Sequence, residues 1–244
     1  TGTTNGCFNT ATATVTVRPS LLVSVNSPNI CSGQTANLVA TGATTYTWTG
    51  GLTSIANPTT PILTSTQTYT VTGEKNGCFG TATATVTVKP NPIVAVTSPS
   101  ICSGQTASLL VSGANNYTWT GGLPSISNPN TPILTTTQIY TVTGETNGCF
   151  GSATSTVTVK PNPVLTVTSQ SICSGQNAQP TASGATTYTW TGGLASVSNP
   201  LTPILTSTQT YTVTGEINGC FKSAISTITV KPNPIVVVTS PSIC

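Results

Sequence analysis

Apolar and polar residues alternate along most of this chain, and the alternation is clearest between residues 78 and 88. There Ala82, Ala84, Val86 and Val88 occupy every second position, and threonines occupy the positions between them. Successive side chains of a β-strand point to opposite faces, so this period of two predicts a half-buried strand. The same reasoning predicts the preceding strands at residues 19–30, 35–41, 44–49, 61–64 and 68–73.

Four motifs recur along the chain in a single register, with a constant step of 71 in the numbering. Asn-Gly-Cys-Phe begins at positions 5, 76, 147 and 218, and Ile-Cys-Ser-Gly-Gln begins at positions 30, 101 and 172. Tyr-Thr-Trp-Thr-Gly-Gly-Leu and Tyr-Thr-Val-Thr-Gly-Glu recur between them, so the chain is built from internal repeats. We expect an interior window of a longer protein. The predicted segments are the last strand of a preceding repeat (1–18), three complete repeats (19–89, 90–160 and 161–231) and the first strand of a following repeat (232–244).

The positions of the aromatic residues and of one turn indicate the fold of each repeat. Tyr46 and Trp48 share one face of their strand, and Asn76-Gly77 between two alternating strands is typical of a tight hairpin. Short strands at this spacing predict an all-β chain of tandem immunoglobulin-like β-sandwich repeats that form a rod. The predicted core residues are Trp48, Trp119, Trp190, Tyr69, Tyr140 and Tyr211.

Composition narrows the function, because the chain has few ionisable side chains. Six Lys or Arg and three Glu are its only charged residues, and Asp and His are absent. Acid-base catalysis and hydrolytic metal centres use clustered His or carboxylates, so we expect no enzyme, no catalytic residue, no metal, no cofactor and no small-molecule substrate. The isolated positive charges and the short apolar runs predict neither nucleic-acid binding nor membrane insertion.

The motif series resembles a known family of repeats. Cys-Ser-Gly-Gln, Tyr-Thr-Trp, Thr-Tyr-Thr-Val-Thr-Gly-Glu and Asn-Gly-Cys are similar to the PKD-like and Ig-like tandem repeats of giant cell-surface adhesins and filaments in Bacteroidetes-type bacteria. The resemblance implies type IX secretion, an outer-surface or filament location, and a role in adhesion, gliding motility or filament building. The chain departs from the PKD pattern because it has no Asp. It also departs from its own pattern, because Pro180 replaces Leu38 and Leu109 and so predicts an edge or a bulge.

Eight cysteines, two in each period, favour disulfides in an exported chain. Pairing Cys31 with Cys78 inside one repeat would imitate an immunoglobulin bridge. However, the two predicted turns lie at opposite ends of the sandwich, roughly 25 to 30 Å apart, and a disulfide spans only about 7 Å between Cα atoms. We therefore favour pairs between neighbouring repeats, with the intra-repeat pair and free thiols as alternatives. The predicted pairs are Cys31 with Cys149 and Cys102 with Cys220, while Cys7, Cys78, Cys173 and Cys244 pair with repeats outside the window.

The linkers Lys89-Pro90-Asn91-Pro92 and their copies are short and proline-rich, which favours stiffness. We therefore predict an extracellular stalk or filament segment, with neighbouring repeats of the same fibre as partners and lateral contacts to other copies as an option. The alternative is a ligand- or carbohydrate-binding adhesin module. Glu74 and its copies are expected to be solvated, and Phe79 and its copies either to pack into the joint between repeats or to cap their own sandwich.

Overall fold

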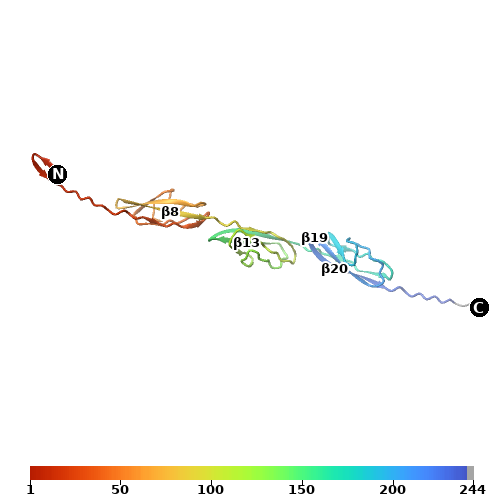
Figure 1. Cartoon of the computed structure of the whole chain (residues 1–244). Helices are drawn as coiled ribbons and strands as arrows, with labels where there is room; N and C mark the ends of the chain where they lie inside the picture. Colours follow the sequence, from red (N-terminus) through yellow and green to blue (C-terminus); the bar gives the residue numbers. More distant parts are fainter. Residues whose placement is uncertain (241–244) are drawn as a thin grey trace, which may run out of the picture. The chain divides into compact units, whose positions relative to one another are not determined.

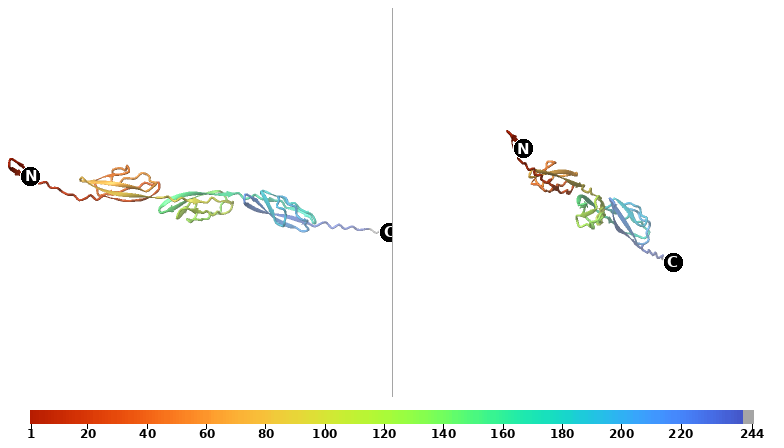
Figure 2. Two further views of the ribbon diagram at one scale, coloured as in Figure 1. Left: turned by 45° about the horizontal axis from the view of Figure 1, so that its top comes forward. Right: turned by 60° about the vertical axis from the view of Figure 1, so that its left-hand side comes forward.

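The computed structural model describes residues 1–240, and the regular structure of that part is β-strand. Figure 2 shows from two directions that the ribbon of these residues contains no helix. The fold is all-β, and its repeats are immunoglobulin-like β-sandwiches. Its contacts divide the chain into two compact units. Unit 1 comprises Thr1–Ile93, Gly113–Asn115 and Gly144–Gly151, and unit 2 comprises Val94–Ser112, Asn116–Thr143 and Ser152–Cys244.

The strands recur in the same order in each repeat. An N-terminal hairpin precedes them, formed by β1 (Gly2–Thr4) and β2 (Cys7–Asn9). The first repeat contains β3 (Ser24–Val25), β4 (Asn29–Cys31), β5 (Ala40–Thr41), β6 (Thr45–Trp48), β7 (Gln67–Lys75) and β8 (Cys78–Lys89). The second contains β9 (Ala95–Val96), β10 (Ser100–Cys102), β11 (Val111–Ser112), β12 (Asn116–Trp119), β13 (Gln138–Thr146) and β14 (Cys149–Lys160). The third contains β15 (Thr166–Val167), β16 (Gln170–Cys173), β17 (Ala182–Ser183), β18 (Thr187–Trp190), β19 (Gln209–Ile217) and β20 (Cys220–Lys231).

Each repeat has a four-stranded sheet built on one long hairpin. In the first repeat the order is β4-β8-β7-β6, in which β4 runs parallel to β8 and the other neighbours are antiparallel. The third repeat has the same arrangement, and β19 and β20 can be followed side by side in Figure 1. The opposite layer contains the pair β3-β5, and hydrogen bonds join residues 34–41 to residues 56–63.

The first strand of each repeat is split in two, which differs from the continuous strand predicted over residues 19–30. β3 pairs with β5 in one sheet, and β4 pairs with β8 in the other. Pro28 has no N–H to continue a ladder. The side chain of Asn26 accepts a hydrogen bond from Val39 N on one side, while the hydroxyl of Ser27 accepts one from Thr85 N on the other. Between β3 and β4, the side chains of Asn26 and Ser27 therefore form hydrogen bonds to both sheets while the chain passes from one sheet to the other.

The segments at 35–41 and 61–64 are also less regular than the predicted strands. Only β5 and isolated bridges such as Gln34 to Leu63 are formed there. Pro58 and Pro61 lie in the partner segment and lack the N–H that a continuous ladder requires. Backbone bonds from Leu38 N to Pro58 O and from Leu63 N to Gln34 O hold the layer in place instead.

The core of each repeat lies between these two layers. In the first repeat Leu38, Val71 and Val86 are completely buried, and Trp48 and Tyr69 pack into the same cluster. Burial alternates along β6 and β8 as the sequence pattern predicts, and the outward positions are mostly threonines. Apolar burial of this kind is the main stabilising contribution to each sandwich.

The third repeat accommodates Pro180 by a change in hydrogen bonding. Pro180 is as fully buried as Leu38 and Leu109, but it has no N–H to donate as those residues do. Gln170, which replaces a proline of the other repeats, binds the neighbouring backbone: its side chain accepts from Gln179 N at 2.9 Å and donates to Gln179 O at 2.8 Å. The segment containing Pro180 is therefore retained in the layer through a side chain.

Candidate functional site: cysteine turns and hairpin ends

The hairpin end of the first repeat, residues 74–79, is a tight turn with a carboxylate brace. Asn76 and Gly77 have φ angles of 52° and 77°, which these two residue types tolerate better than others. Glu74 Oε1 accepts a hydrogen bond from Gly77 N at 2.6 Å, and Glu74 Oε2 accepts one from Thr45 Oγ1 at 3.2 Å. Glu74 is half-exposed, and beyond the solvated side chain that the sequence predicts, its carboxylate fixes the turn. The equivalent turn bonds are Gly148 N to Glu145 Oε1 and Gly219 N to Glu216 Oε1.

The cysteine turn of the first repeat, residues 31–34, follows β4. The Gln34 side chain accepts a hydrogen bond from Cys31 N at 3.0 Å, and Ser32 N donates to Lys89 O at 2.8 Å. The turn is thereby attached to the last residue of β8. The glutamine bond recurs at Cys102 and Cys173, with Gln105 and Gln176 as acceptors.

In unit 1 the first cysteine turn meets the second hairpin end. Cys31 and Cys149 form a disulfide with a Cα–Cα distance of 5.6 Å, and Cys149 is completely buried. Beside it, the ammonium group of Lys89 donates a hydrogen bond to Asn147 O at 3.3 Å. A covalent bond and a charged hydrogen bond therefore hold the same turn.

In unit 2 the same contacts occur one repeat further on. Cys102 and Cys220 form a disulfide with a Cα–Cα distance of 5.6 Å, and Cys220 is completely buried. Lys160 Nζ donates to Asn218 O at 3.1 Å. Both disulfides have a sequence separation of 118, so the two joints are built to one plan.

The register of β4 on β8 explains why Cys31 and Cys78 do not meet. Cys31 pairs with Lys89 at the end of β8, whereas Cys78 is its first residue. The strand is 12 residues long, which corresponds to roughly 35 Å at about 3.3 Å per residue. The structure contains Cys7, Cys78 and Cys173 as thiols, and Cys244 lies outside the described residues.

The linker packs directly against the start of the following hairpin strand, a contact that the motif analysis missed. Asn91 Nδ2 donates to Ser32 O at 3.1 Å, which ties the linker to the cysteine turn. A Cβ atom on Gly151 would lie 2.0 Å from Pro92 O, so the close approach requires glycine. The recurrence of Gly80 and Gly151 after the Cys-Phe pair was the available sequence signal. Lys222 stands at the equivalent position of the third repeat.

The predicted aromatic core residues lie inside the repeats. Trp48, Trp119 and Trp190 expose 5 to 7% of their surface, and the Trp48 indole N–H donates to Ile55 O at 2.9 Å. Tyr69 lies beneath Gly50, where an added Cβ atom would approach its ring to 2.9 Å. These rings therefore fill the sandwich. The corresponding buried tyrosines are Tyr140 and Tyr211.

The phenylalanines beside the hairpin cysteines are exposed, so neither predicted placement was right. Phe79, Phe150 and Phe221 expose 68, 60 and 64% of their surface. In β8 neighbouring side chains point to opposite faces, so an inward Cys78 places Phe79 outward, where it is paired with Glu74 across the hairpin.

Within residues 1–240, no group of three or more His, Cys, Asp or Glu side chains could hold a metal ion. In the same part of the chain no helix is long and apolar enough to cross a membrane. The chemistry that these sites offer is the formation and exchange of disulfides.

No protein-family model and no curated protein matches the sequence. Among solved structures, the chain is similar to a three-Ig structure of titin, with 14% identity, a TM-score of 0.43 and coverage of 86% of this chain and 98% of that one. It is also similar to the N-terminal eight Ig domains of Down Syndrome Cell Adhesion Molecule (15% identity, TM-score 0.40, 87% and 37% coverage). A third similar structure contains three N-terminal domains of the Hoc capsid protein of bacteriophage RB49 (15%, 0.36, 88% and 99%). Nothing about the function of this chain follows from these likenesses.

Proposed function

We propose that this chain is a load-bearing segment of an extracellular stalk or filament, in which disulfides connect consecutive repeats into one mechanical element. The observation that carries the proposal is the pair of disulfides Cys31–Cys149 and Cys102–Cys220. Disulfides persist in oxidising environments outside the cytosol, which agrees with an extracellular role. The boundaries 19–89, 90–160 and 161–231 and the pairing of the remaining cysteines with further repeats belong to the same proposal.

The two disulfide loops overlap in the sequence, and this has a mechanical consequence. The shortest covalent route between residues 31 and 220 does not follow the backbone. It runs through the disulfide from Cys31 to Cys149, back along the chain to Cys102, and through the second disulfide to Cys220. When the repeats unfold under tension, only the segment 102–149 lies on this route, and the segments 31–102 and 149–220 cannot extend. At about 3.5 Å per extended residue, these two segments withhold roughly 500 Å of chain.

Stretching single molecules with and without reductant tests this proposal. Before reduction, the contour length released by unfolding should be shorter by roughly 500 Å than after reduction. The variant Cys31→Ser with Cys149→Ser is the matched control, because it keeps only one of the two loops and should release an intermediate length. Equal lengths before and after reduction would contradict the proposal, as would a non-reduced digest in which Cys31 is linked to Cys78.

The origin and location of the fibre form a finer part of the proposal. The motif resemblance supports a Bacteroidetes-type surface protein exported by the type IX route, with a role in adhesion, gliding or filament building. Treating intact cells with a protease tests the location, because a surface protein is cleaved while the cells stay closed. Protection of the chain in intact cells would exclude this location.

A ligand-binding adhesin module is the second candidate, and the exposed phenylalanines favour it. One large aromatic ring per repeat stands in solvent at Phe79, Phe150 and Phe221. A single exposed ring does not by itself mark an interaction site, so the observation that favours this candidate is the recurrence of the ring at the same position of each repeat. A glycan array probed with the wild-type chain and with a triple Phe→Ala variant tests this function. Signals lost only in the variant would favour it over a purely mechanical role.

A further inference from the structure

The hairpin end of the first repeat has the same sequence as the two that are bonded, but its cysteine is free. Cys149 and Cys220 are disulfide-bonded and completely buried, whereas Cys78 is a partly exposed thiol. Asn76 and Gly77 have the same left-handed turn as Asn147 and its glycine. The local structure of a bonded hairpin end is therefore present at Cys78 without its partner.

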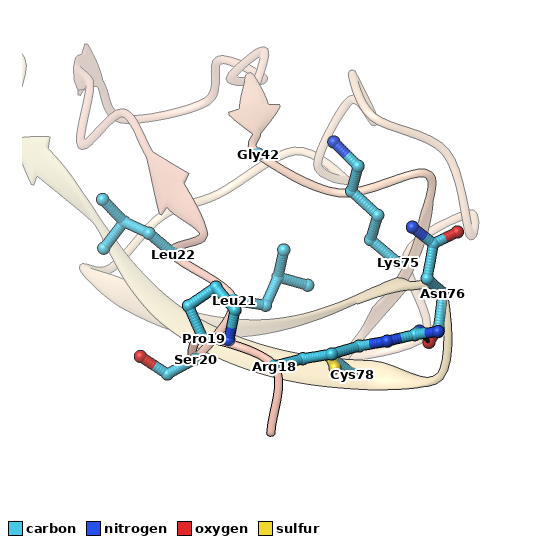
Figure 3. Close-up of a pocket in the computed structure, with 9 residues that line it drawn as sticks. All are labelled: Arg18, Pro19, Ser20, Leu21, Leu22, Gly42, Lys75, Asn76 and Cys78. Carbon is cyan, nitrogen blue, oxygen red and sulfur yellow. Dashed lines mark hydrogen bonds between the residues drawn. The ribbon is translucent and has the colours of Figure 1, made fainter. Parts of the chain in front are cut away.

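A pocket lies at this free hairpin end. It has a volume of about 350 Å³, and Arg18, Leu21, Gly42, Asn76 and Cys78 are among its lining residues. Figure 3 shows Arg18 passing over Cys78 toward Asn76, and its guanidinium donates a hydrogen bond to Asn76 O. Cys78 therefore lines an open space bounded by the incoming chain and the hairpin, and the Arg18 side chain passes over its sulfur (Figure 3).

The equivalent residues in unit 1 show which partner is bonded to such a hairpin end. Lys89, Asn147 and Cys149 lie one period further along the chain than Arg18, Asn76 and Cys78. There the lysine binds Asn147 O, as Arg18 binds Asn76 O, and Cys149 is bonded to Cys31 of a cysteine turn. In unit 2 Cys220 holds Cys102 in the same way.

We propose that the pocket at Cys78 is an acceptor site for the Ile-Cys-Ser-Gly-Gln turn of another repeat of this type, and that a disulfide closes it. The inference rests on the proposed function and adds a specific docking partner to it. Cys173 carries such a turn with a free thiol, and Gln176 braces it as Gln34 braces the turn at Cys31. A free acceptor and a free donor are thus present in one chain.

The bond can be formed without an external oxidant when the donor cysteine carries a leaving group. The Cys78 thiolate attacks the sulfur of a donor cysteine held as a mixed disulfide with 2-nitro-5-thiobenzoate. One S–S bond forms, one S–S bond breaks, and the aromatic thiolate leaves with the electron pair. The released thiolate is coloured, so its absorbance follows the reaction directly.

The test uses the whole chain with Cys78 as the single free thiol, which requires Cys7→Ser, Cys173→Ser and Cys244→Ser. Two activated probes are offered: a peptide with the sequence of residues 28–37, and a second whole chain in which Cys173 is the single free thiol. The reference probe is a peptide of the same composition in scrambled order. We expect Cys78 to react with at least one turn probe about tenfold faster than with the scrambled peptide, because the pocket orients the turn.

Cys7 supplies a matched control within the same chain. It lies in the same Asn-Gly-Cys-Phe motif and in a hairpin, β1–β2, but Cys7 is exposed and its hairpin precedes residues without strand structure. A chain with Cys7 as the single free thiol should show a weaker preference for the turn probes than Cys78, because its hairpin stands apart from any strand layer: β2 ends at Asn9 and the next strand begins at Ser24. The acceptor proposal is overturned if Cys78 prefers neither turn probe, or if Cys7 shows an equal preference. A non-reduced digest of the wild-type chain reports separately on Cys31–Cys149, so the stalk proposal can fail or survive independently.

Discussion

The interior of a repeat and its hairpin end differ in where their contact partners come from. The interior around Leu38, Val71 and Trp48 is filled by side chains of the same repeat, and its residues reach near-complete burial without outside help. At the hairpin end the cysteine is completely buried where a cysteine turn from another repeat is bonded to it, at Cys149, and partly exposed where none is, at Cys78. Changes in the interior should therefore affect one sandwich, and changes at the hairpin end should affect the connection between sandwiches.

The largest expected effect is the loss of an interior aromatic ring. Trp119→Ala removes a side chain with 7% exposure and its hydrogen bond to Ile126 O. We expect the free energy of unfolding of that repeat to fall by about 3 to 5 kcal/mol because a cavity remains. Urea unfolding followed by far-UV circular dichroism measures it. Phe150→Ala, which truncates an exposed ring, is the control. An equal loss of unfolding free energy in this variant would show that burial of the ring is not what stabilises the repeat.

Removing one joint disulfide should have the next largest effect. Cys102→Ser with Cys220→Ser opens a loop whose cysteines have a sequence separation of 118. We expect a loss of about 2 to 4 kcal/mol in the free energy of unfolding, chiefly because the unfolded chain becomes less constrained. The strand content in circular dichroism should not change. Collapse of the strand signal would show that the hairpin end is needed for folding of the sandwich itself.

A smaller effect of opposite sign is expected from Pro180→Leu. Leucine restores the N–H that Leu38 donates to Pro58 O and Leu109 donates to Pro129 O. We expect the third repeat to gain about 1 kcal/mol in its free energy of unfolding, the usual contribution of one hydrogen bond. The reverse change, Leu109→Pro, should destabilise the second repeat. A loss of stability in Pro180→Leu would indicate that the surrounding residues have adapted to proline.

The smallest expected effect concerns the carboxylate brace of the hairpin. Glu74→Gln keeps an oxygen for Gly77 N but removes the charge from a hydrogen bond of 2.6 Å. Because this site is partly exposed, we expect a loss of only about 0.5 kcal/mol in the free energy of unfolding. Thermal unfolding of Glu74→Gln beside Glu74→Ala measures it, and the alanine variant should lose more. Equal stability of the wild-type chain, Glu74→Gln and Glu74→Ala would show that Glu74 does not stabilise the turn.

The structure agrees with the sequence pattern where a short run of residues decides the local fold. The alternation along residues 78–88 appears in the burial of β8, and Asn76-Gly77 forms the predicted hairpin turn. The sequence patterns failed where two alternative placements of one side chain were weighed without regard to strand alternation. Phe79 was assigned to a packed position, although its place next to an inward Cys78 on one strand requires it to point outward.

By itself, the sequence determined the repeat period, the β-strand character and the aromatic interior, because these depend on side-chain alternation and on local turn chemistry. Only the tertiary structure decided the crossing of the first strand between sheets, the brace from Glu74 and the choice among the cysteine pairings that the sequence had left open. The physical reason is that these features depend on strand register. Cys31 lies beside Lys89, one full strand length from Cys78, and that distance leaves a neighbouring repeat as its partner.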